Sequence, residues 1–187
     1  MRCGNQCAAT SEAKEQEKLI SILPHINYEA SGIDKQPTIQ FTGVNLQVID
    51  GSGSESTLNG TGSLILGDDE KPGTQTGSHN LLLGGPGQSD SSYGGILAGH
   101  FNTISNGYAS ILGGAYNTAA GLGSTITGGY SNKTSINNST VSGGGGGEAS
   151  GILASVTGGR LGKAPYFAST VLGGLEEVTE KEFGVTP

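Results

Sequence analysis

The sequence of 187 residues has no tryptophan, few charged residues and no long apolar run. Hydrophobic residues make up 33% of the chain, aromatic residues 5% and charged residues 13%, against about 45–50% apolar residues in ordinary globular domains. A conventional globular core is therefore excluded. No apolar run approaches the roughly 20 residues that a membrane-spanning helix needs. The net charge of −7 comes without any cluster of Lys and Arg, so we expect no nucleic-acid partner.

Cysteine is scarce, with Cys3 and Cys7 as its two copies. A C-x₃-C pair without further Cys or a nearby His does not supply the four ligands of a zinc site, and we expect neither a metal nor a cofactor. The pair either forms interchain disulfides where the N-termini of an oligomer meet, or consists of two free thiols in a disordered tip over residues 1–10. The first ten residues contain no apolar stretch of the kind found in a signal peptide, and we expect none.

Glycine is abundant, with 35 copies, and in the second half of the chain it recurs as pairs at a regular interval. Uniform spacing of this kind indicates a repeat architecture. Successive first glycines lie 15 residues apart, except for one interval of 14, and at the second block His100 replaces the second glycine. The expected turn glycines are Gly84, Gly99, Gly113, Gly128, Gly143, Gly158 and Gly173.

Alignment on these glycines brings out an aliphatic column two residues earlier. Its members are Leu82, Leu97, Ile111, Ile126, Val141, Val156 and Val171. Hydroxyl residues mostly flank this column on both sides, which is the alternation of a short β-strand. A second column of small residues comprises Ala119, Thr134, Ala149 and Ala164, after turn positions at Asn117, Asn132, Gly147 and Gly162. Two short strands and two corners per repeat predict an all-β protein, a β-solenoid with coils of about 15 residues over residues 63–175.

Other repeat classes do not fit this period. A hexapeptide helix needs a multiple of six, and a calcium-binding nonapeptide roll needs an aspartate column. Between Ser91 and Leu175 the charged residues are Lys133, Glu148, Arg160 and Lys163, so no carboxylate column exists. Because each coil offers one large aliphatic side chain to a core, we expect several chains to share an axial core in a homo-oligomer.

The flanking segments differ from the repeats. Residues 11–24 predict a short helix that ends at Pro24, either the end of a coiled-coil stalk with Leu19, Ile22 and Ile26 along its seam or a capping helix. Residues 38–62 predict a strand-like lead-in followed by a loop, and residues 176–187 a charged cap or tail that covers the open edge. An insertion near the first coils is either a binding surface or a solvated turn; its charged residues are Asp68, Asp69, Glu70 and Lys71.

Candidate catalytic residues are absent from the sequence pattern. His25, His79 and His100 have no Cys or Asp partner at catalytic spacing, and the serines lack a G-x-S-x-G context, so we expect no enzyme. One surface feature carries possible chemistry, a Thr/Ser ladder similar to the flat faces of ice-binding solenoids. The alternative is an interior or interface ladder. Its residues are Thr125, Thr127, Thr140, Ser142, Ser155 and Thr157.

The repeats SILGGAYNTAAGLGSTITGGYSNKTSINNSTVSGG resemble the head repeats of YadA-like trimeric autotransporter adhesins. They are also similar to the S-x-V-x-G-G repeats of bacterial surface proteins and of some phage fibres. The resemblance covers roughly residues 64–174 and implies a left-handed β-roll in three parallel chains, with inner strands that build a common core. It departs from the adhesin repeat at Thr127, Ser142 and Thr157, where a second aliphatic residue is usual, and in the helix that precedes the repeats.

The resemblance implies a function in attachment. We expect a non-enzymatic structural or adhesive protein, the head or shaft of a trimeric fibre, located extracellularly, at a cell surface or on a phage virion. Its expected partners are its own copies and a surface ligand that the sequence does not identify. The alternative function is ice binding (antifreeze) through the Thr/Ser ladder.

Overall fold

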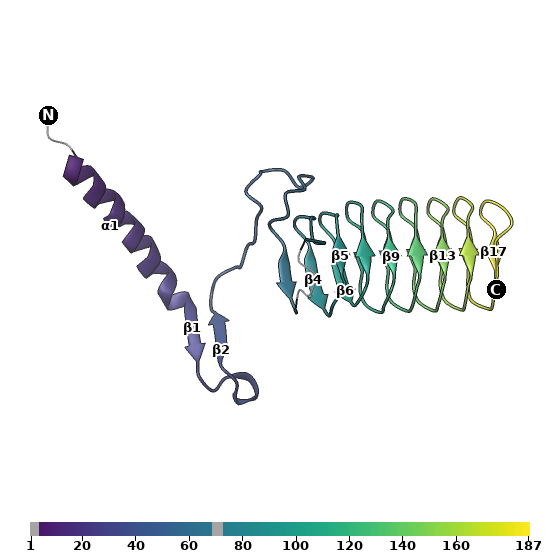
Figure 1. The fold of residues 1–187 in the computed structure, drawn as a ribbon, viewed down its shortest axis with the longest axis horizontal. Coiled ribbons are helices and arrows are strands. Elements are labelled where there is room, and N and C mark those ends of the chain that lie inside the picture. Colours follow the sequence, from purple (N-terminus) through teal and green to yellow (C-terminus); the bar gives the residue numbers. More distant parts are fainter. Residues whose placement is uncertain (1–3, 69–72) are drawn as a thin grey trace. The chain divides into compact units, whose positions relative to one another are not determined.

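The computed structural model describes residues 4–68 and 73–187. The chain divides into two compact units, residues 1–47 and 48–187, which are described separately. The larger unit is a β-solenoid of stacked parallel coils, and the single α-helix lies in the smaller one (Figure 1). The prediction of a β-solenoid with a short N-terminal helix is thus confirmed.

The N-terminal unit contains one helix, two 3₁₀ turns and one antiparallel strand pair. Along the chain these elements are α1 (Gly4–Ile22), η1 (Leu23–His25), β1 (Ile26–Glu29), η2 (Ile33–Lys35) and β2 (Thr38–Phe41). β1 and β2 pair with Ile26 opposite Phe41. The imidazole of His25 bonds through Nδ1 to the carbonyl of Thr42 at 2.9 Å, next to this pair.

The helix is longer at its start than the sequence predicts. It begins at Gly4 rather than at residue 11, so a disordered tip over residues 1–10 is wrong for residues 4–10; Cys7 is helical, and Cys3 lies outside the described residues. Ala8 and Ala9 are strong helix formers that extend the segment backwards. Pro24 sits in the 3₁₀ turn that follows the helix.

Two further expectations for this unit need correction. Ile26 belongs to β1, so it does not continue a helical seam with Leu19 and Ile22. The strand-like lead-in is regular only at Thr38–Phe41, because those residues have β1 as a partner, whereas residues 45–50 have no regular structure. Residues 51–62 form the expected loop of bends and turns.

The solenoid consists of two parallel sheets, one on each side of the coil (Figure 1). The nine-stranded sheet contains β3 (Leu64–Leu66), β4 (Leu81–Gly84), β6 (Ile96–Gly99), β8 (Ser110–Ile111), β10 (Thr125–Ile126), β12 (Thr140–Val141), β14 (Ser155–Val156), β16 (Thr170–Val171) and β17 (Val185–Thr186). The six-stranded sheet contains β5 (Ser89–Asp90), β7 (Thr103–Ile104), β9 (Thr118–Ala119), β11 (Lys133–Thr134), β13 (Glu148–Ala149) and β15 (Lys163–Ala164).

The one interval of 14 residues, between Gly99 and Gly113, changes the pairing at a corner and leaves the strand positions aligned. Leu97 pairs with Ile111, so the strand keeps its inward and outward positions, as it must to keep its apolar residues inside. His100 pairs with Ala115, which places Gly99 beside Gly114 rather than beside Gly113. His100 therefore does not stand at the position of the second paired glycines, as the sequence alignment suggests, but one residue later, in the column of Ala115 and Tyr130, and it lies on the exposed corner.

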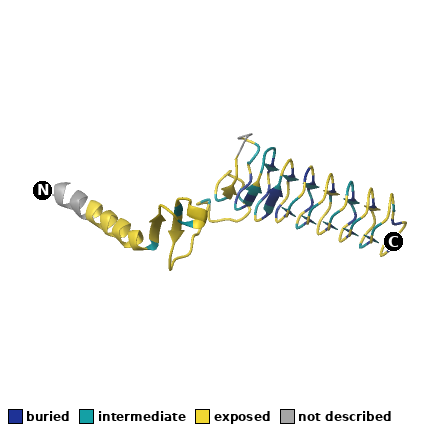
Figure 2. Ribbon diagram, turned by 90° about the horizontal axis from the view of Figure 1, so that it is seen from below, coloured by how far each residue is buried: buried dark blue, intermediate teal, exposed yellow. Residues whose placement is uncertain are grey.

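The interior of the coil is narrow, and one chain closes it. All seven members of the aliphatic column are at most 3% exposed, and Ala119, Thr134, Ala149 and Ala164 face them at 0%. In Figure 2 buried segments recur along the stacked coils. The aliphatic column is therefore filled within a single chain, so any contact that the solenoid makes with another chain has to use its outward-facing residues.

An asparagine ladder lines one corner of the interior. Asn102, Asn117 and Asn132 are buried. The Oδ1 of each accepts the backbone N–H of the residue one coil further on, at 2.8–2.9 Å, the last acceptor bond coming from Gly147. Each Nδ2 donates to carbonyls of its own corner and of the next coil. The ladder thus satisfies corner backbone groups that the sheets leave unpaired.

The C-terminal segment is a further coil. Val178 bridges to Lys163, and β17 continues the nine-stranded sheet beside β16. Residues 176–187 therefore do not break the repeat, contrary to the expectation from their charge. Because the acidic side chains point outward and are mostly exposed, they do not disturb the interior, where Thr179 is buried in the small-residue column.

Candidate functional site

At each later corner the two paired glycines differ: the second position requires glycine, and the first has room for a side chain. The second glycines, Gly114, Gly129, Gly144, Gly159 and Gly174, have φ between 78° and 90°, in the region that favours glycine. A Cβ on Gly144 would overlap the carbonyl oxygen of Gly159 in the next coil, whereas a Cβ on Gly143 meets nothing within 4 Å. Of the turn glycines expected from the sequence, Gly84 and Gly99 have a positive φ, and the other five do not.

The outer face of the nine-stranded sheet carries the Thr/Ser ladder. Thr125, Thr140 and Ser155 pair in register along the stack and are half-buried, while Thr127, Ser142 and Thr157 form the exposed outer column. Towards both ends of the sheet the outward positions become apolar, and none of them is charged. The apolar outward residues are Leu64, Leu66, Leu81, Leu83, Ile96, Ala98, Leu112, Leu172 and Val185.

The outer face of the six-stranded sheet has a different chemistry. Lys133 pairs with Glu148, and Glu148 pairs with Lys163, so opposite charges alternate along neighbouring strands. Opposite charges at facing positions stabilise a sheet modestly in solvent. The face of the six-stranded sheet therefore carries charge, and the face of the nine-stranded sheet carries hydroxyl and apolar side chains alone.

A cavity of about 190 Å³ opens at the corner of the first coils, lined by Glu55, His79, Tyr93, Gly94 and Tyr108. The rings of Tyr93 and Tyr108 meet edge to face, with centroids 5.1 Å apart. The Tyr108 hydroxyl donates a hydrogen bond of 3.1 Å to Glu55 Oε2, and this bond together with the charge of Glu55 raises the pKa of Tyr108. A second cavity of about 360 Å³ shares Glu55 and His79.

The loop that supplies Glu55 is fixed to the solenoid by polar contacts. His79 Nε2 lies 3.3 Å from Asp50 Oδ1, and Asn59 and Ser78 exchange two hydrogen bonds of 3.0 Å. Hydrogen bonds from Ser52 hold the pKa of Asp50 below its ordinary value, so its carboxylate remains an acceptor. Since the Asp50 carboxylate accepts, Nε2 of His79 donates to it, and the buried Nδ1 has no hydrogen-bond partner.

Sequence reasoning missed these residues. His79 lies 29 positions from its partner Asp50, and Glu55 lies 53 positions from Tyr108. The chain brings them together through an aperiodic loop, for which the repeat offers no template. The one available signal is the pair of tyrosines at the start of the repeats, Tyr93 and Tyr108, although an aromatic pair, Phe167 and Phe183, stands again at the equivalent positions of the last coils.

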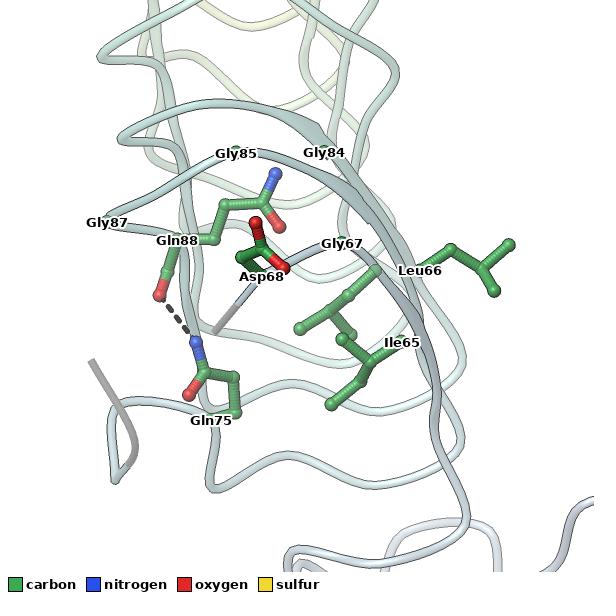
Figure 3. A pocket seen from close by; sticks show the side chains of 10 residues that line it. Ile65, Leu66, Gly67, Asp68, Gln75, Gly84, Gly85, Gly87 and Gln88 are labelled. Carbon is green, nitrogen blue, oxygen red and sulfur yellow. Dashed lines mark hydrogen bonds between the residues drawn. The ribbon is translucent and has the colours of Figure 1, made fainter. Parts of the chain in front are cut away.

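A smaller cavity lies beside β3 at the first coil (Figure 3). Its volume of about 20 Å³ is enough for about one water molecule. The Gln75 amide donates a hydrogen bond of 2.9 Å to the Gln88 carbonyl there, and Gln75 Oε1 is buried without a partner. Asp68 lines this cavity, and the other charged residues of the expected insertion, 69–71, lie outside the described residues.

Several kinds of site are absent from the part of the chain that the structure describes. No cluster of three His, Cys, Asp or Glu is placed to hold a metal ion there, and none of its helices is long and apolar enough to cross a membrane. The imidazole of His79, although paired with Asp50, has no nucleophilic hydroxyl bonded to its other nitrogen. Comparison of the chain with protein-family models, with curated proteins and with solved structures finds no match.

Proposed function

We propose that this protein is a non-enzymatic structural module, the head or shaft of a homotrimeric attachment fibre at a cell surface or on a phage virion. The observation that carries the proposal is the lack of any buried residue in the described part of the N-terminal unit, residues 11–47. Its large apolar side chains are exposed, among them Ile33 at 77%, Tyr28 at 63% and Ile39 at 63%. A unit of this kind has no core of its own, and contact with further copies of the chain would cover these side chains.

The chemistry of the two solenoid faces supports the same proposal. The six-stranded sheet presents alternating charges, while the outward columns of the nine-stranded sheet carry none. Depletion of charged residues is typical of the core of a surface that packs against protein. We therefore assign the contact between copies to the nine-stranded sheet.

An exposed aromatic corner adds to the surface that self-association would cover. Phe101 and Tyr116 stack with centroids 5.0 Å apart, and Tyr130 follows edge to face at 5.3 Å. Tyr116 is 49% exposed and Tyr130 59%. The number of chains, three, comes from the resemblance of the repeats to adhesin heads.

The mass of the protein in solution tests the proposal. Light scattering on a size-exclusion column under reducing conditions should give about 56 kDa, three times the 18.7 kDa of one chain. Reducing conditions exclude an assembly that depends on disulfides of the two cysteines. A folded protein with the mass of one chain, 18.7 kDa, at micromolar concentration would contradict the trimer.

The alternative function, ice binding, is favoured by one observation. Six hydroxyl residues stand in register on a regular parallel sheet, in the outward columns of β10, β12 and β14. Ice binding needs the outer face of the nine-stranded sheet to be exposed to solvent. It therefore requires that light scattering give the mass of one chain. Thermal hysteresis that Thr140→Tyr abolishes, in a protein of single mass, would establish ice binding in place of the fibre module.

A further inference from the structure

One column of corner residues runs through the first three coils, and its middle member has no side chain. His79, Gly94 and Tyr108 occupy equivalent positions of three successive coils, as the bridge between Ser78 and Tyr93 and the bond from Tyr108 N to Tyr93 O indicate. All three have a positive φ, of 57°, 66° and 57°. The ring of Tyr108 leans toward Gly94, with two ring carbons 3.0 and 3.1 Å from the position that a Cβ would take there. The slot is the cavity that opens beside this ring, lined also by His79, Tyr93 and Glu55.

The slot has two further walls. Tyr93 stands beside Tyr108 with its ring edge to face, and the loop brings Glu55 across the opening, bonded to the Tyr108 hydroxyl. The cavity of about 190 Å³ is enclosed by these residues and Gly94. The contacts of Asp50 and Asn59 with the coil keep the loop in place, so the slot exists before any ligand arrives.

The aromatic walls of the slot fit a planar group. A flat group in the cavity of about 190 Å³ would pack against the rings of His79, Tyr93 and Tyr108, as planar groups do with aromatic side chains. Among protein groups, the guanidinium is planar, stacks on aromatic faces and donates hydrogen bonds to carboxylates.

The charged group of the slot accepts hydrogen bonds. Glu55 is a carboxylate whose Oε2 accepts the hydrogen bond from the Tyr108 hydroxyl. Among the described residues the only ion pair is the one between His79 and Asp50, so no Lys or Arg neutralises Glu55. A flat ligand without charge would desolvate the Glu55 carboxylate without forming an ion pair with it, which costs free energy.

We propose that this slot binds a guanidinium group, packed against the aromatic rings that line the cavity and bonded to the carboxylate of Glu55. The source is either an arginine side chain of a partner polypeptide or a free guanidino compound. Every wall of the slot comes from one chain, so the proposal stands apart from the trimer and extends the proposed function by naming a ligand class.

The test uses the full chain and tyrosine fluorescence or NMR spectra of the tyrosine rings, since the protein has no tryptophan. The probe is N-acetyl-arginine amide, with N-acetyl-citrulline amide as a neutral, planar control of the same shape and N-acetyl-lysine amide as a non-planar cation. We expect the arginine derivative to bind at least tenfold more tightly than either control. Equal affinity for arginine and citrulline derivatives, or no binding at millimolar concentration, would overturn the proposal.

Matched variants locate the binding. Glu55→Gln should weaken it at least tenfold, and Gly94→Asn should abolish it by filling the slot. Asparagine is compatible with the backbone there, because Asn138 occupies the same column with a φ of 55°. Gly123→Asn, the same change one coil beyond Tyr108, should leave the affinity unchanged, and equal effects of both glycine variants would contradict the location.

Two further measurements separate the sources and the proposals. Tighter binding of a Gly-Arg-Gly peptide than of the single residue would assign a polypeptide partner, and equal binding would assign a free guanidino compound; both support the slot. The mass of each variant is measured in parallel. If the protein binds the arginine derivative and has the mass of one chain, the slot proposal holds and the trimer is disproved. If it has the mass of three chains and does not bind, the trimer holds and the slot proposal is disproved.

Discussion

Two adjacent glycines at each later corner differ in what they tolerate. Gly144 has a φ of 79°, and a Cβ on it would meet the backbone of the next coil, while Gly143 faces open space. Gly144→Ala should therefore lower stability by roughly 2 kcal/mol or more, from the backbone conformation and the overlap together. Gly143→Ala should change it by less than about 0.5 kcal/mol. Thermal unfolding followed by circular dichroism measures both, and equal melting temperatures would show that the corner relaxes.

Asp90 is a buried carboxyl in a column where later coils have uncharged residues. It pairs with Ile104, is 1% exposed, and accepts a hydrogen bond of 2.7 Å from Asn80 Nδ2, while its Oδ1 has no partner. Burial raises the pKa of Asp90 above its ordinary value of 3.8. Its protonated form is thus favoured in the folded state, and its contribution to stability is fully present below pH 3.8 and is lost as pH rises through the folded pKa.

Asp90→Asn should for that reason stabilise the protein at neutral pH, by an amount on the order of 1–3 kcal/mol. The gain should shrink as pH falls and vanish below the ordinary carboxyl pKa, where Asp90 itself is neutral in both states. Melting temperatures at pH 7, 5 and 3.5 measure this trend. The exposed control Glu180→Gln should show no such gain at pH 7, and a gain for Asp90→Asn that does not depend on pH would refute the electrostatic cause.

The asparagine ladder links consecutive coils into one structural element. Asn117 accepts the N–H of Asn132 at 2.9 Å and donates to the carbonyl of Gly129 at 3.1 Å. Asn117→Ala leaves these buried groups without partners, and we expect a loss of about 2 kcal/mol or more. Asn137→Ala, at an exposed corner position, should change stability by less than about 0.5 kcal/mol. Urea unfolding of both variants measures the difference, which would be absent if water replaced the amide.

The elements that repeat were predictable, and those that occur once were not. The period placed the strands of the solenoid because every coil repeats the same inward and outward alternation, as at Ile111, Ile126 and Val141. β1 was missed because its four residues, Ile-Asn-Tyr-Glu, carry no strand signal of their own until β2 is known to pair with them. The one-residue deletion near Gly99 was misaligned, because glycine letters alone do not reveal which of two neighbours has a positive φ.

The same distinction explains the candidate sites. The Thr/Ser ladder follows from the repeat, and its outward position was visible in the alternation with Val141 and Val156. The slot at Gly94 was not, since it depends on three coils in register and on a loop that has no repeat. Glu55 reaches Tyr108 only through the fold of residues 50–62, and that fold depends on single contacts such as the one between Asp50 and His79.

The face that joins copies of the chain can be tested with one substitution on each sheet. Thr127 lies in the exposed outer column of the nine-stranded sheet, and Thr118 lies outward on β9 of the six-stranded sheet, next to Lys133. Thr127→Glu would place a carboxylate from every copy at the proposed contact, where like charges cost several kcal/mol. Thr118→Glu adds the same charge on a face that already carries Glu148.

We expect Thr127→Glu to lower the mass measured by light scattering to that of one chain, while Thr118→Glu keeps the mass of the unmodified protein. Both should retain the circular dichroism of the solenoid, because each chain buries its own aliphatic column. If both variants keep the unmodified mass, the nine-stranded sheet does not form the contact, and the exposed apolar N-terminal unit must hold the copies together alone. If Thr118→Glu alone dissociates the assembly, the contact lies on the charged face and the assignment is wrong.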